Sequence, residues 1–578
     1  MSAQAVSKGI LSIGSWSVVK MATSALVLPI LARMLGIEGY GQYAYYMALL
    51  LLASQFANVG MMQTMTKRIA ERPEDVAWCR AVAHAGALIN AVGLLSVSVV
   101  VGLVVGTTAP AGTAALPIAL VIVGVLMFDQ VWFYARGVLH GLRHEARAAI
   151  PGMIGVVSAG LLGVLAATAG LGVTGVFAGL LTANLFVAMA CLRAVLKVLS
   201  GSECRESGRT VSSVTGPLLR FGLPAMLFSV LNMALCSLDV ILVRHLAGEA
   251  QAGLYAAAIQ WSQFVRCIPI AVAGVMLQAA ARLWAEQRVD EVSQLVGRLV
   301  RYVLVGTTFL LLLVAVLGEQ IVTVYFGPRF ADAALGLRLL VPGALCYAVA
   351  RVLWPVIQAG GEGGHLVRLI GMIVLVDVGL CGSLIPLWGA AGAAMATSIS
   401  FALVAVGYVW MLHRRRVQVF EQAHLFRWLL LSMGTALAIA LVAAWVTPPL
   451  LSILVGAVVG TVLYWGLPAW ACAGRRNRTH GEQSAGRVPP DRGTAVPVPR
   501  TGVAATQSRS LELGGLCLWI DTRSQSSFPR WGETRWHCAG LRWSGRPGRR
   551  MRLLSSSMNS DAAWYGLEMR ALPDPQVT

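Results

Sequence analysis

The sequence predicts an all-α membrane protein that crosses the bilayer about fourteen times. Of its 578 residues, 57% are hydrophobic and only 12% are charged, and the mean hydropathy is +0.71. A soluble domain is typically about half apolar and about a quarter charged. This composition therefore has too few polar groups to cover a water-soluble enzyme, and its many apolar residues exclude disorder as the main state.

Fourteen apolar runs are long enough to span a membrane, since a helix needs about 20 mostly apolar residues to cross the hydrocarbon core. The connections on one side are short and leave no room for an external catalytic domain. The predicted spans are 10–33, 40–63, 81–106, 114–138, 148–170, 172–192, 216–243, 253–279, 299–317, 335–358, 366–388, 390–412, 427–446 and 449–471.

The distribution of Lys and Arg predicts the orientation. Most of these residues within 1–472 lie at the N-terminus and in every second connection, whereas the opposite connections hold only Arg33, Arg244, Arg329 and Arg338. Cytoplasmic loops carry the excess of positive charge, so both ends of the membrane part are predicted to be cytoplasmic. This orientation and a basic tail account for the net charge of +19, and we expect no nucleic-acid partner.

An internal repeat is the strongest signal in the chain. Residues 31–44 and 242–256 both read Leu-x-Arg-x-Leu, followed, with one insertion, by Gly, Glu, Gly and Tyr-Ala. Six predicted spans separate the copies, and an even number preserves orientation. The halves are therefore parallel repeats, with a substrate site expected near the midplane between them and transport by alternating access. The predicted division is an N-terminal six-helix lobe (1–205), a C-terminal six-helix lobe (206–412) and two additional helices (413–472).

The repeat also carries a family resemblance. Residues 32–44, Phe221-Gly222-Leu223-Pro224, Asp239 and the amphipathic stretch 282–286 resemble polysaccharide flippases of the multidrug/oligosaccharidyl-lipid/polysaccharide exporter superfamily, over about residues 8–412. The resemblance implies a multi-pass protein of the bacterial inner membrane. Such a protein moves an undecaprenyl-pyrophosphate-linked oligosaccharide from the cytoplasmic to the outer leaflet, for surface polysaccharide such as exopolysaccharide or O-antigen. Implied partners are this glycan, membrane lipids and polysaccharide polymerase machinery, with no cofactor and no metal.

Three cations lie well away from the ends of predicted spans: Lys20, Arg266 and Arg351. A charge at a helix centre costs about 2.5–3.5 kcal/mol on insertion scales, so such a residue is expected to face a cavity or a partner. Lys20 and Arg266 belong to different halves and are placed to face one cavity, where they would attract a pyrophosphate. Pairing with a carboxylate, or snorkelling to the interface, is the alternative for each.

Three carboxylates inside the spans are candidates for ion coupling: Asp377, Asp129 and Asp239. Asp377 is nearest the middle of a span and is preferred, whereas a structural role is expected for Asp239 near a helix end. Uncharged polar residues form a predicted sugar path, with interhelical hydrogen bonding as the alternative. They are His84, Asn90, Asn184, Asn232, Gln260 and Gln263.

Other functions stay open. A cation-coupled multidrug exporter of the same superfamily would have an apolar, acidic cavity without a cationic centre. A membrane enzyme of polysaccharide assembly would need a large external loop or a cluster of catalytic carboxylates, and the sequence has neither, so we predict that the chain is not an enzyme. A non-transporting scaffold would use its charges only for structure.

Residues 473–578 differ in character from the rest. Arg, Ser, Gly and Pro dominate, Lys is absent, and no run reaches spanning length. We expect a disordered basic tail or an out-of-frame translation of GC-rich sequence, and we assign it no function.

Overall fold

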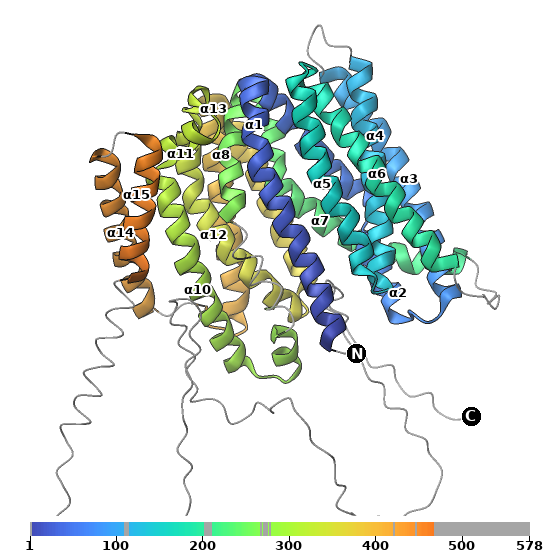
Figure 1. The fold of residues 1–578 in the computed structure, drawn as a ribbon. Coiled ribbons are helices and arrows are strands. Elements are labelled where there is room, and N and C mark those ends of the chain that lie inside the picture. Colours follow the sequence, from blue (N-terminus) through green and yellow to red (C-terminus); the bar gives the residue numbers. More distant parts are fainter. Residues whose placement is uncertain are drawn as a thin grey trace, which may run out of the picture. The chain divides into compact units, whose positions relative to one another are not determined.

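The computed structural model is helical throughout the residues that it describes, which are 3–108, 115–200, 211–265, 279–419, 422–445 and 448–466 with Pro269 and Met276 (Figure 1). The basic tail lies outside this range. The elements are α1 (Ala3–Asn58), α2 (Met61–Glu71), α3 (Val76–Thr108), α4 (Ala115–Gly141), α5 (Glu145–Thr168), α6 (Gly172–Ser200), α7 (Val211–Ala247), α8 (Glu249–Val265), α10 (Val289–Val316), α11 (Gly318–Tyr325), a 3-10 turn η1 (Pro328–Phe330), α12 (Ala333–Ala359), α13 (Gly363–Arg414), α14 (Gln422–Trp445), α15 (Pro449–Thr461) and a π-helical turn η2 (Val462–Gly466).

The predicted class, an all-α polytopic membrane protein, is confirmed. Within the described ranges, nine helices are long and apolar enough to cross a membrane. Two of them, α1 and α13, each contain two predicted spans that meet at a glycine with positive φ, Gly36 at 73° and Gly389 at 53°. Shorter apolar helices cover the last two predicted spans. The number fourteen stays a prediction.

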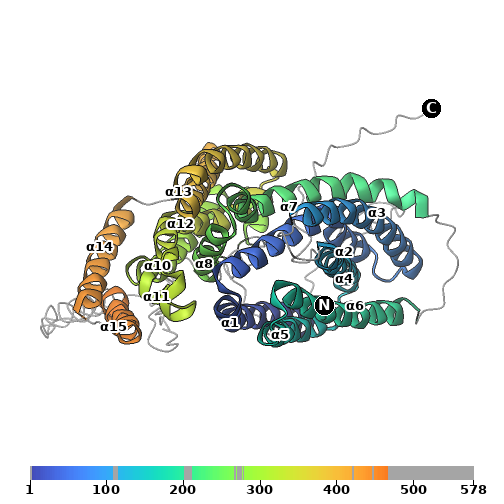
Figure 2. The ribbon, with the colours of Figure 1, turned by 90° about the horizontal axis from the view of Figure 1, so that it is seen from above.

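The helices of residues 3–460 pack in two groups. Helices α3, α4, α5 and α6 run side by side, and α10, α12 and α13 form a second group (Figures 1 and 2). Separate apolar cores follow this grouping. One core contains Met65, Val138 and Cys191, and another contains Val300, Leu353 and Phe401. The first core also includes Val214 and Leu218 of α7, so the cores do not mark a boundary at residue 205, and the predicted lobe boundary stays a prediction.

The two copies of the repeat cross each other directly. Helix α1, just beyond its kink at Gly36, packs against the first turn of α8, just beyond Gly248, which also has positive φ. A Cβ at Gly41 would clash with the carbonyl oxygen of Glu249, and a Cβ at Gly253 would clash with that of Ile37. Small residues allow membrane helices to approach closely, so the matched glycines of the repeat permit a pseudo-symmetric crossing. We call this end of the helices the junction end.

Polar side chains surround the crossing. The guanidinium of Arg244 donates to Glu249 Oε1 at 2.9 Å and to the carbonyl oxygen of Thr108 at 2.7 Å, and it lies 4.2 Å from the ring centroid of Tyr45. Gln42 Nε2 donates to Glu249 Oε2 at 2.7 Å. Arg244 and Glu249, on α7 and α8, thus each bind a residue from the first three helices.

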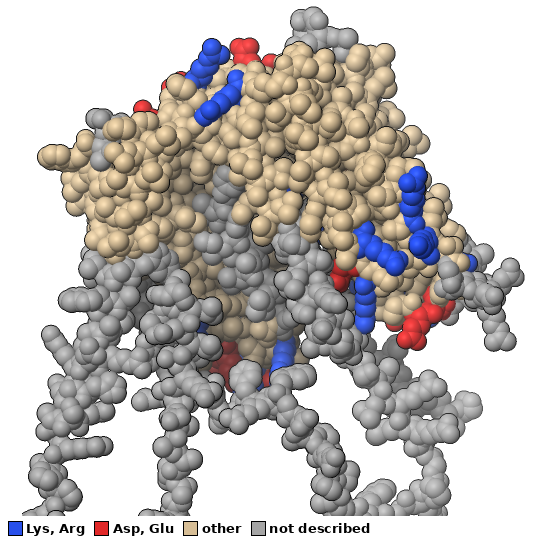
Figure 3. All heavy atoms as spheres, viewed as in Figure 1, with Lys and Arg blue, Asp and Glu red and all other residues tan. Residues whose placement is uncertain are grey.

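Charged side chains are scarce on the middle of the surface. On the face drawn in Figure 3, the Lys, Arg, Asp and Glu side chains lie towards the ends of the helices and leave a broad uncharged region between them. Many large apolar side chains are exposed on the described helices, for example Leu95, Leu161 and Leu375. This arrangement is expected where lipid replaces water as the solvent.

The close crossing of α1 and α8 predicts that a larger side chain at Gly41 destabilises the protein. Replacing Gly41 with Ala places a methyl group against the backbone of α8, and overpacking of this kind typically costs about 1–3 kcal/mol. We expect Gly41→Ala to lower the midpoint of thermal unfolding of the purified protein. The control is Gly106→Ala on α3, where no atom lies within 4 Å of the added Cβ. An equal midpoint for both variants would contradict the crossing.

Candidate functional site

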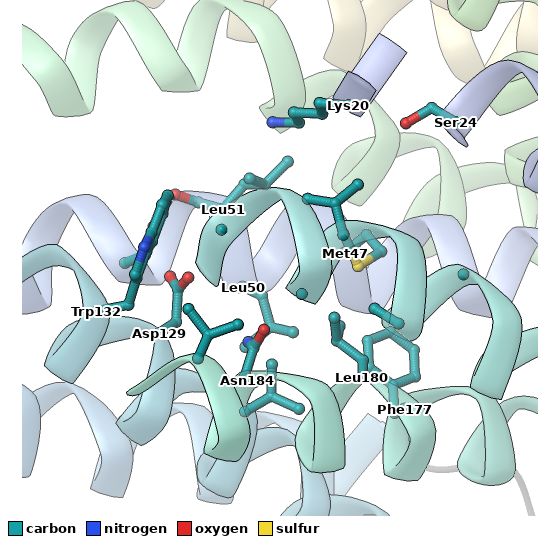
Figure 4. Close-up of a pocket in the computed structure, with 18 of the residues that line it drawn as sticks. Lys20, Ser24, Met47, Leu50, Leu51, Asp129, Trp132, Phe177, Leu180 and Asn184 are labelled. Carbon is teal, nitrogen blue, oxygen red and sulfur yellow. Dashed lines mark hydrogen bonds between the residues drawn. The ribbon is translucent and has the colours of Figure 1, made fainter. Parts of the chain in front are cut away.

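A cavity of about 400 Å³ lies among the helices of the N-terminal half. Its size is within the range of small-molecule sites, roughly 300–1,000 Å³. Its lining residues come from both halves of α1 and from α4, α5 and α6 (Figure 4). All of them lie between residues 20 and 187, so this cavity is enclosed by the predicted N-terminal lobe and not by residues of both lobes.

Two of the predicted charged residues meet in this cavity. Lys20 projects into it from the first half of α1, and Asp129 enters it from α4 (Figure 4). The ammonium and the carboxylate interact electrostatically. Lys20 is exposed to the cavity, which agrees with the rule that a charge inside a span faces a polar space or a partner.

One face of α4 supplies several of the charged and aromatic side chains that line the cavity. Asp129, Trp132, Phe133 and Arg136 all line the cavity, and their spacing of three or four residues places them on one side of a helix. The guanidinium carbon of Arg136 lies 5.4 Å from the ring centroid of Trp132. Arg136 Nε also donates to His140 Nε2 at 3.5 Å. These contacts orient the guanidinium along the cavity-facing side of α4.

The sequence analysis missed Arg136 and Trp132. Arg136 stands two residues before the end of the predicted span 114–138, and it was therefore grouped with the basic residues of the following cytoplasmic connection. A usable signal was present, because Arg136 follows Asp129 by seven residues, which is two helical turns and therefore the same face.

The cavity is polar at one end and apolar at the other. Asp129 and Arg136 lie in the second half of α4, Lys20 lies far from the kink of α1, and Gln55 lies near the end of α1. Toward the junction end the lining becomes apolar and aromatic. It includes Leu28, Leu31, Tyr43, Met47, Val176, Phe177 and Leu180. The rings of Tyr43 and Phe177 lie at this end with centroids 5.7 Å apart. A charged group is therefore accommodated only at the end away from the crossing.

The polar residues of the predicted sugar path lie in different parts of the structure, and only some of them line the cavity. Asn184 lines the cavity from α6. Asn90 is buried and donates from Nδ2 to the carbonyl oxygen of Gln130 at 3.4 Å, and Gln130 Nε2 in turn donates to the carbonyl oxygen of Ser54 at 3.2 Å. His84 is exposed on α3. Asn90 thus takes part in interhelical bonding, the alternative that its sequence position left open.

The other two carboxylates lie together in the C-terminal half. Asp239 on α7 is buried and accepts hydrogen bonds from the Tyr255 hydroxyl and, at 3.1 Å, from Thr397 Oγ1. Asp377 on α13 is also buried and accepts one from Ser400 Oγ at 2.6 Å. The two carboxylates interact electrostatically. This pair joins α7, α8 and both halves of α13.

The remaining predicted residues do not join the N-terminal cavity. Arg351 and Asn232 line a small pocket of about 20 Å³ in the C-terminal half, where the guanidinium of Arg351 lies 5.2 Å from the Trp354 ring centroid. Gln260 is half-buried on α8. Arg266 and the side chain of Gln263 lie outside the described residues, so the expected meeting of Lys20 with Arg266 stays a prediction.

Comparisons with known proteins agree with this geometry. Residues 6–281 match a family model described as "Polysaccharide biosynthesis protein", which confirms the resemblance to the polysaccharide exporters. No curated protein matches the chain.

Solved structures share the fold. A structure titled "Lipid II flippase MurJ, inward closed conformation" aligns with a TM-score of 0.62 at 13% sequence identity, covering 79% of this chain and 97% of that one. An inward-facing multidrug resistance MATE family transporter of the MOP superfamily aligns with a TM-score of 0.54 at 17% identity, covering 69% and 94%. At these identities the likeness is one of fold.

Proposed function

We propose that this chain, a multi-pass membrane protein with the fold of MOP-superfamily transporters and the sequence pattern of polysaccharide biosynthesis proteins, is a flippase. Its substrate is a polyprenyl-pyrophosphate-linked oligosaccharide, which it moves from the cytoplasmic to the outer leaflet of the bacterial inner membrane. The observation that carries the proposal is the cavity in the N-terminal half, whose polar end holds Lys20 and Arg136.

The chemistry of the substrate explains why a cationic cavity is required. A pyrophosphate and the hydroxyls of a glycan lose their water when they enter hydrocarbon, at a cost that rises steeply for an unpaired charge. Two cations inside the membrane replace part of that hydration with charge-assisted hydrogen bonds. The polyprenyl tail needs no such site, because it can remain in the bilayer while only the head group enters the cavity.

The position of the charges supports loading from the cytoplasm. Arg136 precedes the connection from α4 to α5, which contains Arg143, and Arg147 lies in the first turn of α5. The excess of positive charge on this side favours a cytoplasmic location. The polar end of the cavity then faces the leaflet where lipid-linked glycans are expected to be loaded, and the junction end is closed on the outer side.

The C-terminal carboxylates are proposed to couple transport to an ion. Asp239 and Asp377 are both buried, and they accept hydrogen bonds from hydroxyl groups on α8 and α13. Like charges at short range are costly in a medium of low dielectric constant, so this pair favours the uptake of a proton or another small cation. Uptake or release would alter the packing of α7 against α13.

Drug export is the second candidate function. The MATE transporter among the structural neighbours and the aromatic residues of the cavity favour it. An organic cation would be repelled by Lys20 and Arg136, so the two functions differ in their dependence on these residues. A drug exporter would gain activity when either cation is removed, whereas a flippase would lose it.

The decisive experiment is a flipping assay in liposomes. The purified chain is reconstituted with an undecaprenyl-pyrophosphate-linked oligosaccharide, and the glycan on the outer surface is measured over time. Deletion of the gene supplies the cellular counterpart, in which surface glycan should disappear while lipid-linked units accumulate on the cytoplasmic side. Full-length polymer at the surface of the deletion strain would overturn the proposal.

Removal of either cavity cation should weaken head-group binding. A hydrogen bond to a charged group contributes about 1.5–3 kcal/mol, so Lys20→Met is expected to lower affinity and flipping about 10–100-fold. Lys20→Arg should retain much of both. Lys197→Met, an exposed cation at the end of α6, is the matched control and should leave both unchanged. Equal flipping by Lys20→Met and Lys197→Met would remove Lys20 from the site.

Neutralising Asp377, the preferred candidate for ion coupling, should impair transport and leave head-group binding nearly unchanged. Asp377→Asn keeps the size of the side chain and a hydrogen bond with Ser400 but removes the charge. We expect head-group binding to stay within about twofold and ion-driven flipping to fall at least about tenfold. The control is Asp332→Asn, an exposed residue between η1 and α12. Unchanged ion dependence in Asp377→Asn would exclude this role.

A further inference from the structure

The polar end of the N-terminal cavity contains more kinds of side chain than the binding of an anion requires. Besides Lys20 and Arg136, it presents the carboxylate of Asp129, the amide of Asn184 and the indole of Trp132 (Figure 4). A carboxylate beside a pyrophosphate is unfavourable, because like charges repel each other more strongly away from bulk water. Part of the Asp129 charge is balanced by Lys20, and the remaining polar and aromatic groups suit a ligand with a second, uncharged polar part.

A sugar ring has the matching chemistry. Its hydroxyl groups donate to a carboxylate and both donate to and accept from an amide. The C–H groups on the face of the ring pack against an aromatic surface, which supplies a large apolar contact with little loss of entropy. Small-molecule sites generally combine such aromatic walls with a few placed polar groups. Trp132, Asp129 and Asn184 provide all three kinds of contact.

The spacing of residues along α4 holds the diphosphate and the sugar of the ligand at different positions along the helix. Arg136 lies one turn beyond Trp132 and two turns beyond Asp129, and a rise of 1.5 Å per residue places Asp129 about 10 Å from Arg136 along the helix. The contact of Arg136 with the Trp132 ring holds the indole beside the cation. Asn184 enters from α6, near Asp129 (Figure 4). A diphosphate near Arg136 thus leaves the next sugar near Asp129.

We propose that Trp132, Asp129 and Asn184 form a saccharide subsite that selects an uncharged sugar directly attached to the diphosphate. The inference rests on the proposed function, because it requires the diphosphate to lie between Lys20 and Arg136. Asp129 rejects an acidic sugar at this position by repulsion between two carboxylates. Specificity at this sugar then comes from the same face of α4 that supplies a diphosphate contact.

Three lipid probes test the subsite: undecaprenyl diphosphate without sugar, the same lipid bearing one neutral hexose, and the same lipid bearing one hexuronic acid. Binding to the full chain in nanodiscs is measured for each probe. We expect the neutral hexose to bind about tenfold more tightly than the sugar-free lipid, which corresponds to one or two added hydrogen bonds. The hexuronic acid should bind no more tightly than the sugar-free lipid.

Variants assign the discrimination to individual residues. Trp132→Leu and Asn184→Leu should remove most of the tenfold preference for the neutral hexose while changing the affinity for the sugar-free lipid far less. Asp129→Asn should restore binding of the hexuronic acid to the level of the neutral hexose. Trp410→Leu, at an exposed position on α13, is the matched control and should preserve the order of the three probes.

The outcomes separate the two proposals. If the wild-type chain binds the three probes equally, or if Trp132→Leu weakens all three equally, the saccharide subsite is wrong and the diphosphate site stands. If the wild-type chain binds none of the probes and Lys20→Met changes nothing, the proposed function itself fails.

Discussion

The close crossing of α1 and α8 is the constraint on which the rest of the structure depends. Gly41 meets the backbone at Glu249, and Gly253 meets the backbone at Ile37, so neither helix can carry a side chain at the contact. The crossing in turn positions Arg244 and Glu249 to bind Thr108 and Gln42 across the two halves. It also brings Gln251 to the second kink, where its Oε1 accepts a hydrogen bond from the amide of Ala390 at 2.9 Å.

The same helix connects this crossing with the cavity. The second half of α1 crosses α8, while its first half carries Lys20 about 16 residues before the kink at Gly36, which is about 24 Å along a helix. A change in the angle at Gly36 would therefore move Lys20 relative to the face of α4. Glycine tolerates positive φ without steric cost, which explains why the kink of α1 stands at Gly36.

Sequence reasoning recovered the part of the site that depends on single residues. A charged or polar residue within an apolar span is conspicuous, and Lys20, Asp129 and Asn184 were predicted in this way. Arg136 escaped because it stands near the end of a span, where a cation is ordinary. Trp132 escaped because an aromatic residue in a membrane helix is usually an interfacial anchor. Only the helix face that they share with Asp129 gives them a role.

The sequence by itself determined the class of the protein, an all-α membrane protein with many apolar helices, because hydropathy and periodicity act locally along the chain. The exact number of spans and the division into two lobes stay predictions. The tertiary structure decided which polar groups meet: Lys20 with Asp129 in one cavity, and Asp239 with Asp377 in another part of the protein. Such meetings depend on the rotation of each helix about its axis, which is set by packing against neighbouring helices and cannot be read from one helix alone.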